Sequence, residues 1–370
     1  MCAKMYLKVF SLTVKSPTLG PRLKPIQSPL PRTRVLRRIG LLVFLATVLG
    51  SLVACHSSSV GTNSDAITAT ALRDIYQAPD TYADHRAQQQ LFASATGGQI
   101  AYTDHGTGPV LVLLHGVPTS SWMYRKVLPE LQLHFRTISI DLLGYGSSDK
   151  PEATNDLYSA TQQAARVHAL LNHLGIQRYT LMMHDMGGLV AWEMLRAHPQ
   201  SVANLIVQNT IIRDEGFKNP DIKPGAMARR VTRAYSNSWS SAAILTMSFR
   251  SLGLTGNASL NEAECEGYVI PMREGNGDAL YAFFTSLDDT LFERLDSNAE
   301  RFAEFSGDTL ILWGGEDKVL TTQQLPFLTE NLQIKPENIK VYEDNDHFLV
   351  EEIPTEVIAQ VVRFMSTASD

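Results

Sequence analysis

The stretch that most constrains the fold of this chain is YTLMMHDMGGLV, residues 179–190. A run of apolar and β-branched residues stops at a His-Asp pair, and after two glycines apolar residues resume at helical spacing. This pattern predicts a strand, a tight turn and a helix. The residue on such a turn projects from the sheet edge in a strained conformation and needs small neighbours, which Gly187 and Gly188 supply. Asp185 occupies the projecting position, so the candidate nucleophile is a carboxylate.

A carboxylate at this position favours displacement at a saturated carbon. A serine that attacked an epoxide or a carbon–halogen bond would form an ether, which the site could not hydrolyse. A carboxylate forms an alkyl ester instead, and activated water can attack the carbonyl carbon of that ester. The alternative interpretation is that Asp185 only caps the following helix, because aspartate is a favoured N-cap residue.

Residues 1–54 are expected to be a signal peptide. They hold nine Lys and Arg residues and no acidic residue, and the uncharged apolar run from Ile39 to Ala54 is short for a membrane span. The run ends Leu-Val-Ala-Cys, which resembles the lipobox of bacterial lipoproteins, so Cys55 is expected to carry lipid. His56 is compatible with onward sorting, so we expect a lipid-anchored protein of the cell envelope, on the periplasmic side of the outer membrane. The alternatives are a plain signal peptide or a transmembrane anchor.

Residues 55–89 are expected to form a tether and linker with at most one short helix. Removal of residues 1–54 changes the formal net charge from −6 to −15, which argues against nucleic acid and anionic lipid surfaces as partners. With Cys2 removed and Cys55 acylated, Cys265 would have no disulfide partner. No CxxC or HExxH spacing and no nucleotide-binding motif occurs, so we expect neither a metal nor a cofactor.

From residue 90 onward strand-like and helical patterns alternate, which predicts an α/β fold with a mostly parallel eight-stranded sheet and helices on both faces. A Gly97-Gly98 turn between the first two strands predicts an antiparallel edge. The expected strands are residues 90–95, 99–104, 110–114, 136–140, 179–183, 203–208, 309–313 and 339–343, and the expected helices between them are residues 122–131, 159–174, 189–198, 323–332 and 354–365.

The alternation breaks between residues 214 and 300, where only helical patterns occur. We interpret residues 90–213 and 301–370 as the core and residues 214–300 as a helical cap inserted after strand 6. Such a cap would lie over the carboxyl ends of the strands, where α/β proteins place their sites. Its expected helices are residues 226–235, 242–252, 263–270 and 278–291.

Three loops at strand ends carry the other candidate site residues. In HGVPTSSW, residues 115–122, the Val117 amide is expected to face the pocket across a cis bond to Pro118 and to form a two-donor oxyanion hole with the Met186 amide. Asp317 and His347 follow the seventh and eighth strands, which gives the chain order nucleophile, acid, histidine. His347 would activate water and Asp317 would fix its tautomer. His115 and the loop of residues 141–151 are expected to have structural roles.

These features resemble the α/β-hydrolase superfamily, in the branch with an aspartate nucleophile that includes epoxide hydrolases and haloalkane dehalogenases. The motifs that carry the resemblance are HGVPTSSWMYR (115–125), DLLGYGSSDKP (141–151), HDMGG (184–188), WGGEDKV (313–319) and DHFLVEE (346–352). The resemblance implies a hydrolase that acts through an alkyl ester on Asp185. Two positions depart from the dehalogenase pattern, because Met186 replaces a usual halide-binding Trp and Val117 an Asn often found there.

The expected substrates are water and a small apolar organic molecule, with an epoxide favoured over a haloalkane. An epoxide oxygen needs an acidic O–H as the ring opens, and the resemblance implies that cap tyrosines supply it. The candidates are Tyr235 and Tyr268 first, then Tyr281, while Trp239 could replace a missing halide donor. Each of them could instead be a packing residue on a cap helix.

Two further alternatives have different chemistry. A non-hydrolytic binding protein or a cofactor-free oxygenase relative would use the pocket without hydrolysis, but it would not need Asp185, Asp317 and His347 together. A serine-type esterase would need a serine on the projecting turn, and none of the serines at 120, 121, 147 and 148 has that sequence around it.

We expect Cys55→Ser to release the protein from membranes, because the variant lacks the thiol that would carry the lipid. The measurement is the partition of wild type and variant between membrane and soluble fractions. Cys265→Ser, which leaves the lipobox intact, is the matched control. Equal membrane association of the wild type and Cys55→Ser would contradict the lipobox and favour a transmembrane anchor.

Overall fold

A computed structural model describes residues 75–153, 156–218, 225–236, 245, 260–287 and 289–368. The expected signal peptide, Cys55 and Trp239 lie outside the described residues, as does the expected helix of residues 242–252 apart from Leu245. The backbone of Tyr235 is described but its side chain is not.

The core is an eight-stranded sheet with the strand order β1-β2-β4-β3-β5-β6-β7-β8. β2 pairs antiparallel with both β1 and β4, and the other neighbours are parallel, so the predicted fold class is confirmed. All seven residues of β5 are buried, as expected for a strand with helices on both faces. The strands are β1 Gln90–Ala93, β2 Gln99–His105, β3 Val110–Leu114, β4 Arg136–Ile140, β5 Tyr179–Asp185, β6 Val202–Thr210, β7 Thr309–Gly314 and β8 Ile339–Tyr342.

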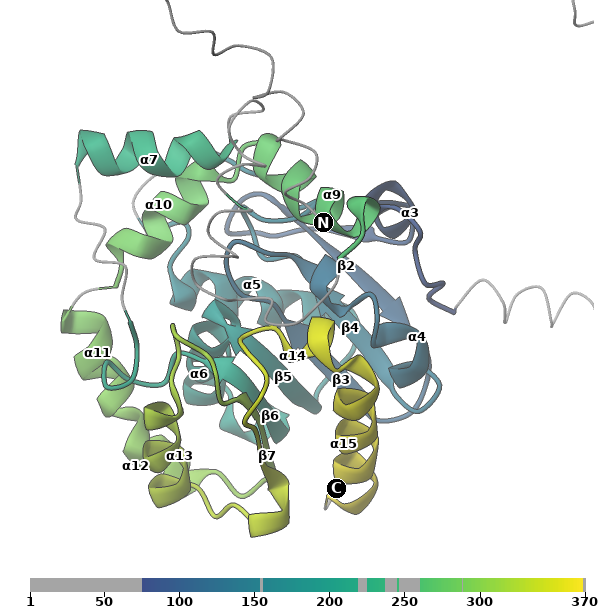
Figure 1. The fold of residues 1–370 in the computed structure, drawn as a ribbon, viewed down its shortest axis with the longest axis vertical. Helices are drawn as coiled ribbons and strands as arrows, with labels where there is room; N and C mark the ends of the chain where they lie inside the picture. The colour runs from purple at the N-terminus through teal and green to yellow at the C-terminus, as the bar shows by residue number, and fades with distance from the viewer. Residues whose placement is uncertain are drawn as a thin grey trace, which may run out of the picture.

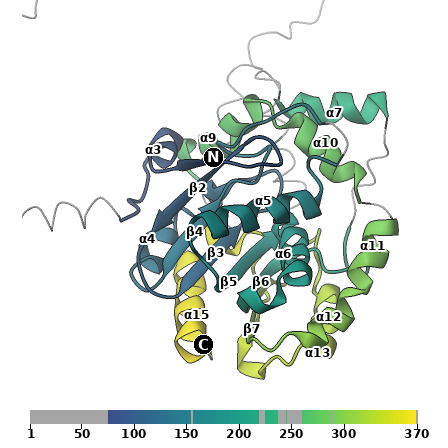
Figure 2. The same cartoon turned by 180° about the vertical axis from the view of Figure 1, so that it is seen from behind.

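Helices cover both faces of this sheet. Figure 2 shows α5 (Ala160–His173) and α6 (Met186–Ala197) across one face, and Figure 1 shows α4 (Leu128–Leu131) and α15 (Pro354–Thr367) on the other. α5 contacts α6, and α15 contacts α4 and β7. The shorter elements of the core are η1 Ser121–Tyr124, η2 Pro199–Ser201, η3 Thr322–Gln324, α13 Leu325–Asn331, η4 Pro336–Asn338 and α14 Leu349–Glu352.

The expected helix over residues 122–131 is instead two short elements, η1 and α4. Pro129 stands in the first turn of α4 and has no backbone N–H to donate to the carbonyl of Arg125. A continuous α-helix would need that hydrogen bond, so the chain turns once as a 3₁₀ helix and starts again at Leu128.

The cap helices lie between β6 and β7 and are α7 Ala226–Ser236, α9 Glu262–Arg273, α10 Gly277–Thr285, α11 Asp289–Asp296 and α12 Asn298–Glu304. Figure 1 shows α7, α9 and α10 grouped above the sheet. A Cβ on Gly267 of α9 would lie 2.2 Å from the ring of Trp122, and a Cβ on Gly144 would lie 2.4 Å from Cβ of Ala279 in α10. The cap therefore packs on the loops after β3 and β4, at the carboxyl ends of the parallel strands.

The cap differs from the sequence prediction in two details. The expected helix of residues 278–291 is divided into α10 and α11, which meet at a break between Thr285 and Asp289. α12 continues past the expected boundary at residue 300 and contacts α6 and α13 of the core.

Part of the expected linker is not a free tether. Residues 75–89 include α3 (Tyr82–Ala87), and Tyr76, Tyr82 and His85 are all buried. The Tyr76 hydroxyl bonds Nδ1 of His85 at 2.7 Å, and α3 contacts α9 of the cap. α3 is the short helix expected in this linker, and the polar atoms of the three buried side chains are paired inside the protein.

The cysteine expectation is also corrected. Cys265 in α9 is disulfide-bonded. Among the residues that the structure describes, no helix has the length and apolar character to cross a membrane.

Gly187→Ala should lower the free energy of unfolding by about 3 kcal/mol, because the added Cβ would lie 2.3 Å from the carbonyl oxygen of Leu114 in the central strand β3. Gly175→Ala is the control, since its φ is +70° but a Cβ there meets nothing within 4 Å, and it should cost about 1 kcal/mol. Urea unfolding of both variants measures the difference. Equal losses would mean that β3 and α6 do not approach as closely as described.

Candidate active site

Asp185 lies on a strained bend between β5 and α6, with φ 49° and ψ −121°. A non-glycine residue at positive φ costs roughly 1–3 kcal/mol and persists only where its surroundings hold it. Here Thr210 Oγ1 donates to the Asp185 carbonyl oxygen at 2.6 Å. Gly116 makes room for the side chain, because a Cβ on Gly116 would lie 2.3 Å from Cβ of Asp185. The turn inferred from the sequence is therefore present, and Asp185 is the residue that occupies it.

Two backbone amides face the Asp185 carboxylate. The Val117 N–H donates to Oδ1 of Asp185 at 2.8 Å. The Met186 N–H lies near enough to the carboxylate to help lower its pKa. The Val117–Pro118 peptide bond is cis, as expected. The two amides proposed from the sequence thus converge on one carboxylate, where they are positioned to stabilise negative charge on its oxygens.

His347 joins Asp185 to Asp317. Nδ1 of His347 lies 2.7 Å from Oδ2 of Asp317, and Nε2 lies 3.8 Å from Oδ2 of Asp185. Asp317 also accepts from the Val319 and Leu320 amides at 2.8 and 2.9 Å, so its carboxylate is held in one orientation. The three side chains from the ends of β5, β7 and β8 are therefore assembled in a buried group.

Asn209 completes this group and was not identified from the sequence. Its Nδ2 donates to Oδ2 of Asp317 at 2.7 Å, and its Oδ1 accepts from the Gly314 amide at 2.9 Å. A polar pair, Gln208-Asn209, directly after the apolar run Leu205 to Val207 was the available signal. Because Asn209 bonds both Asp317 and the end of β7, it fixes the distance between β6 and the acid.

Burial and charge shift the pKa values of the two reacting groups upward. Burial raises the pKa of Asp185, against the opposing effects of His347 and the two amides. Burial alone would lower the pKa of His347, but the charge and hydrogen bond of Asp317, together with the charge of Asp185, raise it above the usual value. Burial, with Asp317 nearby, also raises the pKa of Asp346 to about 7.

Comparisons with known proteins agree with this geometry. A family model described as the alpha/beta hydrolase fold matches residues 109–245. The chain has the α/β-hydrolase fold.

Curated proteins similar to this chain include a cis-3-alkyl-4-alkyloxetan-2-one decarboxylase of Shewanella oneidensis, 25% identical over 288 residues, which cover 74% of this chain and 87% of the relative. Haloalkane dehalogenase 2 of Mycobacterium tuberculosis is 34% identical over 113 residues, which cover 30% of this chain and 39% of the dehalogenase. The chain therefore matches about two fifths of that enzyme's length.

Among solved structures, the epoxide hydrolase CorEH superposes with a TM-score of 0.58 and 24% identity, over 75% of this chain and 98% of CorEH. This likeness establishes a shared fold.

Two of the cap tyrosines expected to open an epoxide, Tyr268 and Tyr281, have described hydrogen-bond partners. The Tyr268 hydroxyl donates to the carboxylate of Glu351, so its proton is engaged in this structure. The Tyr281 hydroxyl accepts from the Gly225 amide at 3.2 Å, and the guanidinium carbon of Arg229 lies 4.1 Å from the centroid of its ring. The side chain of Tyr235 and all of Trp239 are outside the described residues.

The Glu351 carboxylate that engages Tyr268 belongs to a buried ion network between cap and core. Arg125 bonds both Glu351 and Glu264, and Lys126 lies 2.8 Å from Glu351 and 3.1 Å from Glu264. The network therefore joins the end of η1 and α14 in the core to α9 in the cap. Tyr268 and Glu264 were not recognisable as its members because their partners are distant in the sequence.

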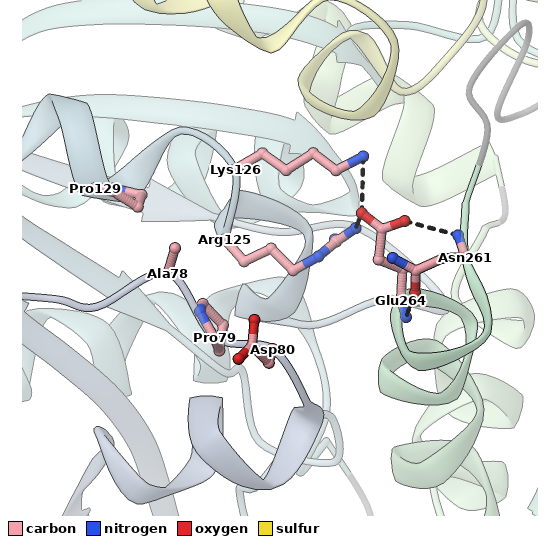
Figure 3. A pocket seen from close by; sticks show the side chains of 8 residues that line it. All are labelled: Ala78, Pro79, Asp80, Arg125, Lys126, Pro129, Asn261 and Glu264. Atoms are coloured by element: carbon pink, nitrogen blue, oxygen red, sulfur yellow. Dashed lines mark hydrogen bonds and ion pairs between the residues drawn. The ribbon is translucent and has the colours of Figure 1, made fainter.

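A cavity of about 200 Å³ lies beside this network (Figure 3). Lys126 and Arg125 approach Glu264 along one side of it. Its wall contains none of Asp185, Asp317 and His347, so it is separate from the candidate site. The lining residues are Ala78, Pro79, Asp80, Arg125, Lys126, Pro129, Asn261 and Glu264.

The two histidines beside the site have supporting roles. His115 bonds the Gly116 carbonyl through Nδ1 and accepts from the Leu142 amide through Nε2, which is the backbone role expected of it. His184 bonds the carbonyl of His347 through Nε2 at 3.0 Å. Burial lowers the pKa values of both rings, so both remain neutral.

No serine replaces Asp185 at this site. Ser121 Oγ bonds Nε2 of His85 at 2.9 Å, and Ser148 Oγ donates to the Asp141 carbonyl oxygen at 2.6 Å. His347 instead pairs with Asp317 and Asp185. Within the described part of the chain, no group of three or more His, Cys, Asp or Glu side chains is arranged to hold a metal ion.

Proposed function

We propose that this protein is a hydrolase that acts through a covalent alkyl ester on Asp185, with an epoxide as the preferred substrate class. The observation that supports this most directly is the position of His347, with Nε2 at 3.8 Å from the Asp185 carboxylate and Nδ1 bonded to Asp317 at 2.7 Å. A nucleophile, a base and an orienting acid in this order perform two-step hydrolysis. A binding protein would not need all three.

In the first step an oxygen of Asp185 attacks a ring carbon of the epoxide. The carbon–oxygen bond of the ring breaks, its electron pair moves to the ring oxygen, and that oxygen takes a proton. The amides of Val117 and Met186 hold the attacking carboxylate in a fixed orientation, so less entropy is lost on reaching the reactive geometry.

In the second step His347 takes a proton from water, and the resulting hydroxide attacks the carbonyl carbon of the ester. Negative charge then develops on the former carboxylate oxygen, where the Val117 and Met186 amides stabilise it. When the tetrahedral intermediate collapses, the alcohol oxygen leaves, takes the proton from His347 and completes a diol.

The described donors favour an epoxide over a haloalkane. A departing halide is stabilised by N–H groups, and Met186 and Val117 offer no side-chain donor. The indole N–H groups of Trp122, Trp192 and Trp313 donate to backbone carbonyls at 3.1, 2.9 and 3.0 Å. Haloalkane dehalogenation remains the alternative, and it would depend on a donor such as Trp239, outside the described residues.

A second candidate is the opening of a four-membered lactone. The relative from Shewanella oneidensis that aligns along 87% of its own length is named as a decarboxylase of oxetan-2-ones, which are strained oxygen rings like epoxides. A panel of one epoxide, one bromoalkane and one cis-3,4-dialkyloxetan-2-one separates the candidates. The epoxide would give a diol, the bromoalkane would release bromide, and the oxetan-2-one would give an alkene and carbon dioxide, so these products are measured.

His347→Gln should still form the ester but fail to hydrolyse it, so the protein should become heavier by the mass of the substrate. Asp185→Asn is the matched control, because an amide of nearly the same shape is a poor nucleophile and should form no adduct. Intact-mass spectrometry after incubation with a substrate that the wild type consumes measures both. If His347→Gln gains no mass, the covalent mechanism is wrong.

The two-step mechanism also has a pH signature. In the free protein the charge of Asp185 helps to raise the pKa of His347, and alkylation removes that charge. The pKa of His347 should therefore be lower in the ester than in the free protein. Hydrolysis needs neutral His347, so its rate should fall only when the pH drops through the pKa of His347 in the ester. Single-turnover hydrolysis against pH, compared with the NMR titration of His347 in the free protein, measures both. A midpoint for hydrolysis at or above the free-protein pKa would contradict this coupling.

A further inference from the structure

Glu351, in the ion network between cap and core, lies only four residues after His347 in the sequence. Its side chain is fully buried, and both of its carboxylate oxygens are bonded. Arg125 contacts the two oxygens, Lys126 lies 2.8 Å from Oε2, and the Tyr268 hydroxyl donates to Oε1. A buried ion network is often no more stabilising than apolar side chains of the same volume, so stability alone does not account for this one.

Glu351 and His347 belong to one tightly bonded segment. The Glu351 N–H donates to the Phe348 carbonyl at 2.9 Å, and the Phe348 ring packs edge-on against the His347 ring, with centroids 5.0 Å apart. On the other side of His347, the Asp346 N–H donates to the Glu352 carboxylate at 3.1 Å. The residues before and after His347 are therefore both bonded to α14, so His347 and α14 are expected to move together.

Arg125 joins this segment to the loop that holds the nucleophile. It directly follows η1 and is eight residues after Val117, whose amide bonds the Asp185 carboxylate at 2.8 Å. A guanidinium that contacts both oxygens of a carboxylate fixes the orientation of the pair as well as its distance. The Arg125–Glu351 pair thus connects the loop after β3, which contacts Asp185, to the loop after β8, which carries His347.

Tyr268 connects the cap to the same carboxylate. It lies in α9 and donates to Oε1 of Glu351, the oxygen that Nη1 of Arg125 also contacts. A second ion pair holds α9 to the core, because Arg86 of α3 donates to both oxygens of Glu274 at 2.7 and 2.8 Å. The two contacts are chemically alike, but only the one at Glu351 involves the segment that carries His347.

We propose that Glu351 is a positioning residue that holds His347 at its working distance from Asp185, and that Tyr268 makes this hold depend on the docking of the cap. This assignment rests on the proposed function. Attack by Asp185 in the first step does not use His347, whereas ester hydrolysis requires His347 to direct water at the ester. A displacement of about 1 Å can cost about 100-fold in rate, so release of Glu351 should slow the second step selectively.

The charges around His347 provide a readout that needs no substrate. Asp317, Asp185 and Asp346 all raise the pKa of His347. The contact between His347 and Asp317 is already 2.7 Å long, so it can only lengthen when the loop is released. A longer contact stabilises the charged imidazole less, so release of Glu351 should lower the pKa of His347.

Arg125→Lys and Tyr268→Phe both loosen the hold on Glu351 without changing the net charge. Lysine lacks the planar fork that contacts both oxygens, and phenylalanine lacks the hydroxyl. Arg86→Lys is the matched control, because it makes the same change in the ion pair that does not involve the His347 segment. An NMR titration of the free full-length protein should show a lower pKa of His347 in the first two variants and an unchanged pKa in the control.

A single turnover of styrene oxide, quenched with acid and followed by intact-mass spectrometry, measures the rise and decay of the ester on Asp185. Arg125→Lys and Tyr268→Phe should slow the decay about tenfold or more and leave the rise within about threefold. Arg86→Lys should change neither rate. If Arg125→Lys does not fold, Tyr268→Phe, which removes a single hydroxyl, still carries both measurements.

Three outcomes would overturn the assignment or the function on which it rests. An unchanged titration of His347 in both variants, together with a lower unfolding temperature, would mean that the network only stabilises the fold. Equal slowing of the rise and the decay would mean that the network supports the whole site and not His347. If styrene oxide forms no ester even in His347→Gln, the proposed function fails, and the titration still decides whether Glu351 positions His347.

Discussion

The site depends on a backbone bend that one residue makes at an energetic cost. Asp185 holds a positive φ because Thr210 fixes its carbonyl, the Val117 and Met186 amides hold its carboxylate, and Gly116 leaves space beside it. These contacts come from the loop after β3, the end of β6 and the start of α6, so several elements together hold the strained bend. Any displacement of β3, β5 or β6 would move the nucleophile relative to His347.

The buried charges of Asp185, Asp317 and His347 suit a two-step reaction. Asp185 and Asp317 both face one histidine, so the free protein favours a charged imidazole between two carboxylates. Such a histidine cannot remove a proton from water. Esterification of Asp185 removes one negative charge and favours the neutral ring that the second step needs. The product of the first step therefore prepares the base for the second.

Features encoded in short runs of sequence were predicted, whereas contacts between residues far apart in the sequence were not. The turn at Asp185, the order of Asp317 and His347, and the strands of the core are encoded in short runs with clear periodicity. The break in the expected helix at Pro129 depends on one missing backbone N–H donor. The burial of Tyr76 and His85 depends on partners in other elements. Cap residues were the least predictable, because their partners lie in core elements that local patterns do not connect to them.

The two tyrosines Tyr268 and Tyr145 illustrate why a hydrogen-bond account is needed beside a motif. Position in the cap favoured Tyr268 as an acid, yet its hydroxyl engages Glu351, four residues after His347, in the network that ties cap to core. Position in a glycine-rich turn favoured a structural role for Tyr145, yet its hydroxyl has no protein partner among the described residues. A hydroxyl whose proton is bound to a buried carboxylate stabilises the contact between cap and core. The role of Tyr268 in this structure is therefore set by its hydrogen-bond partner and not by the segment that carries it.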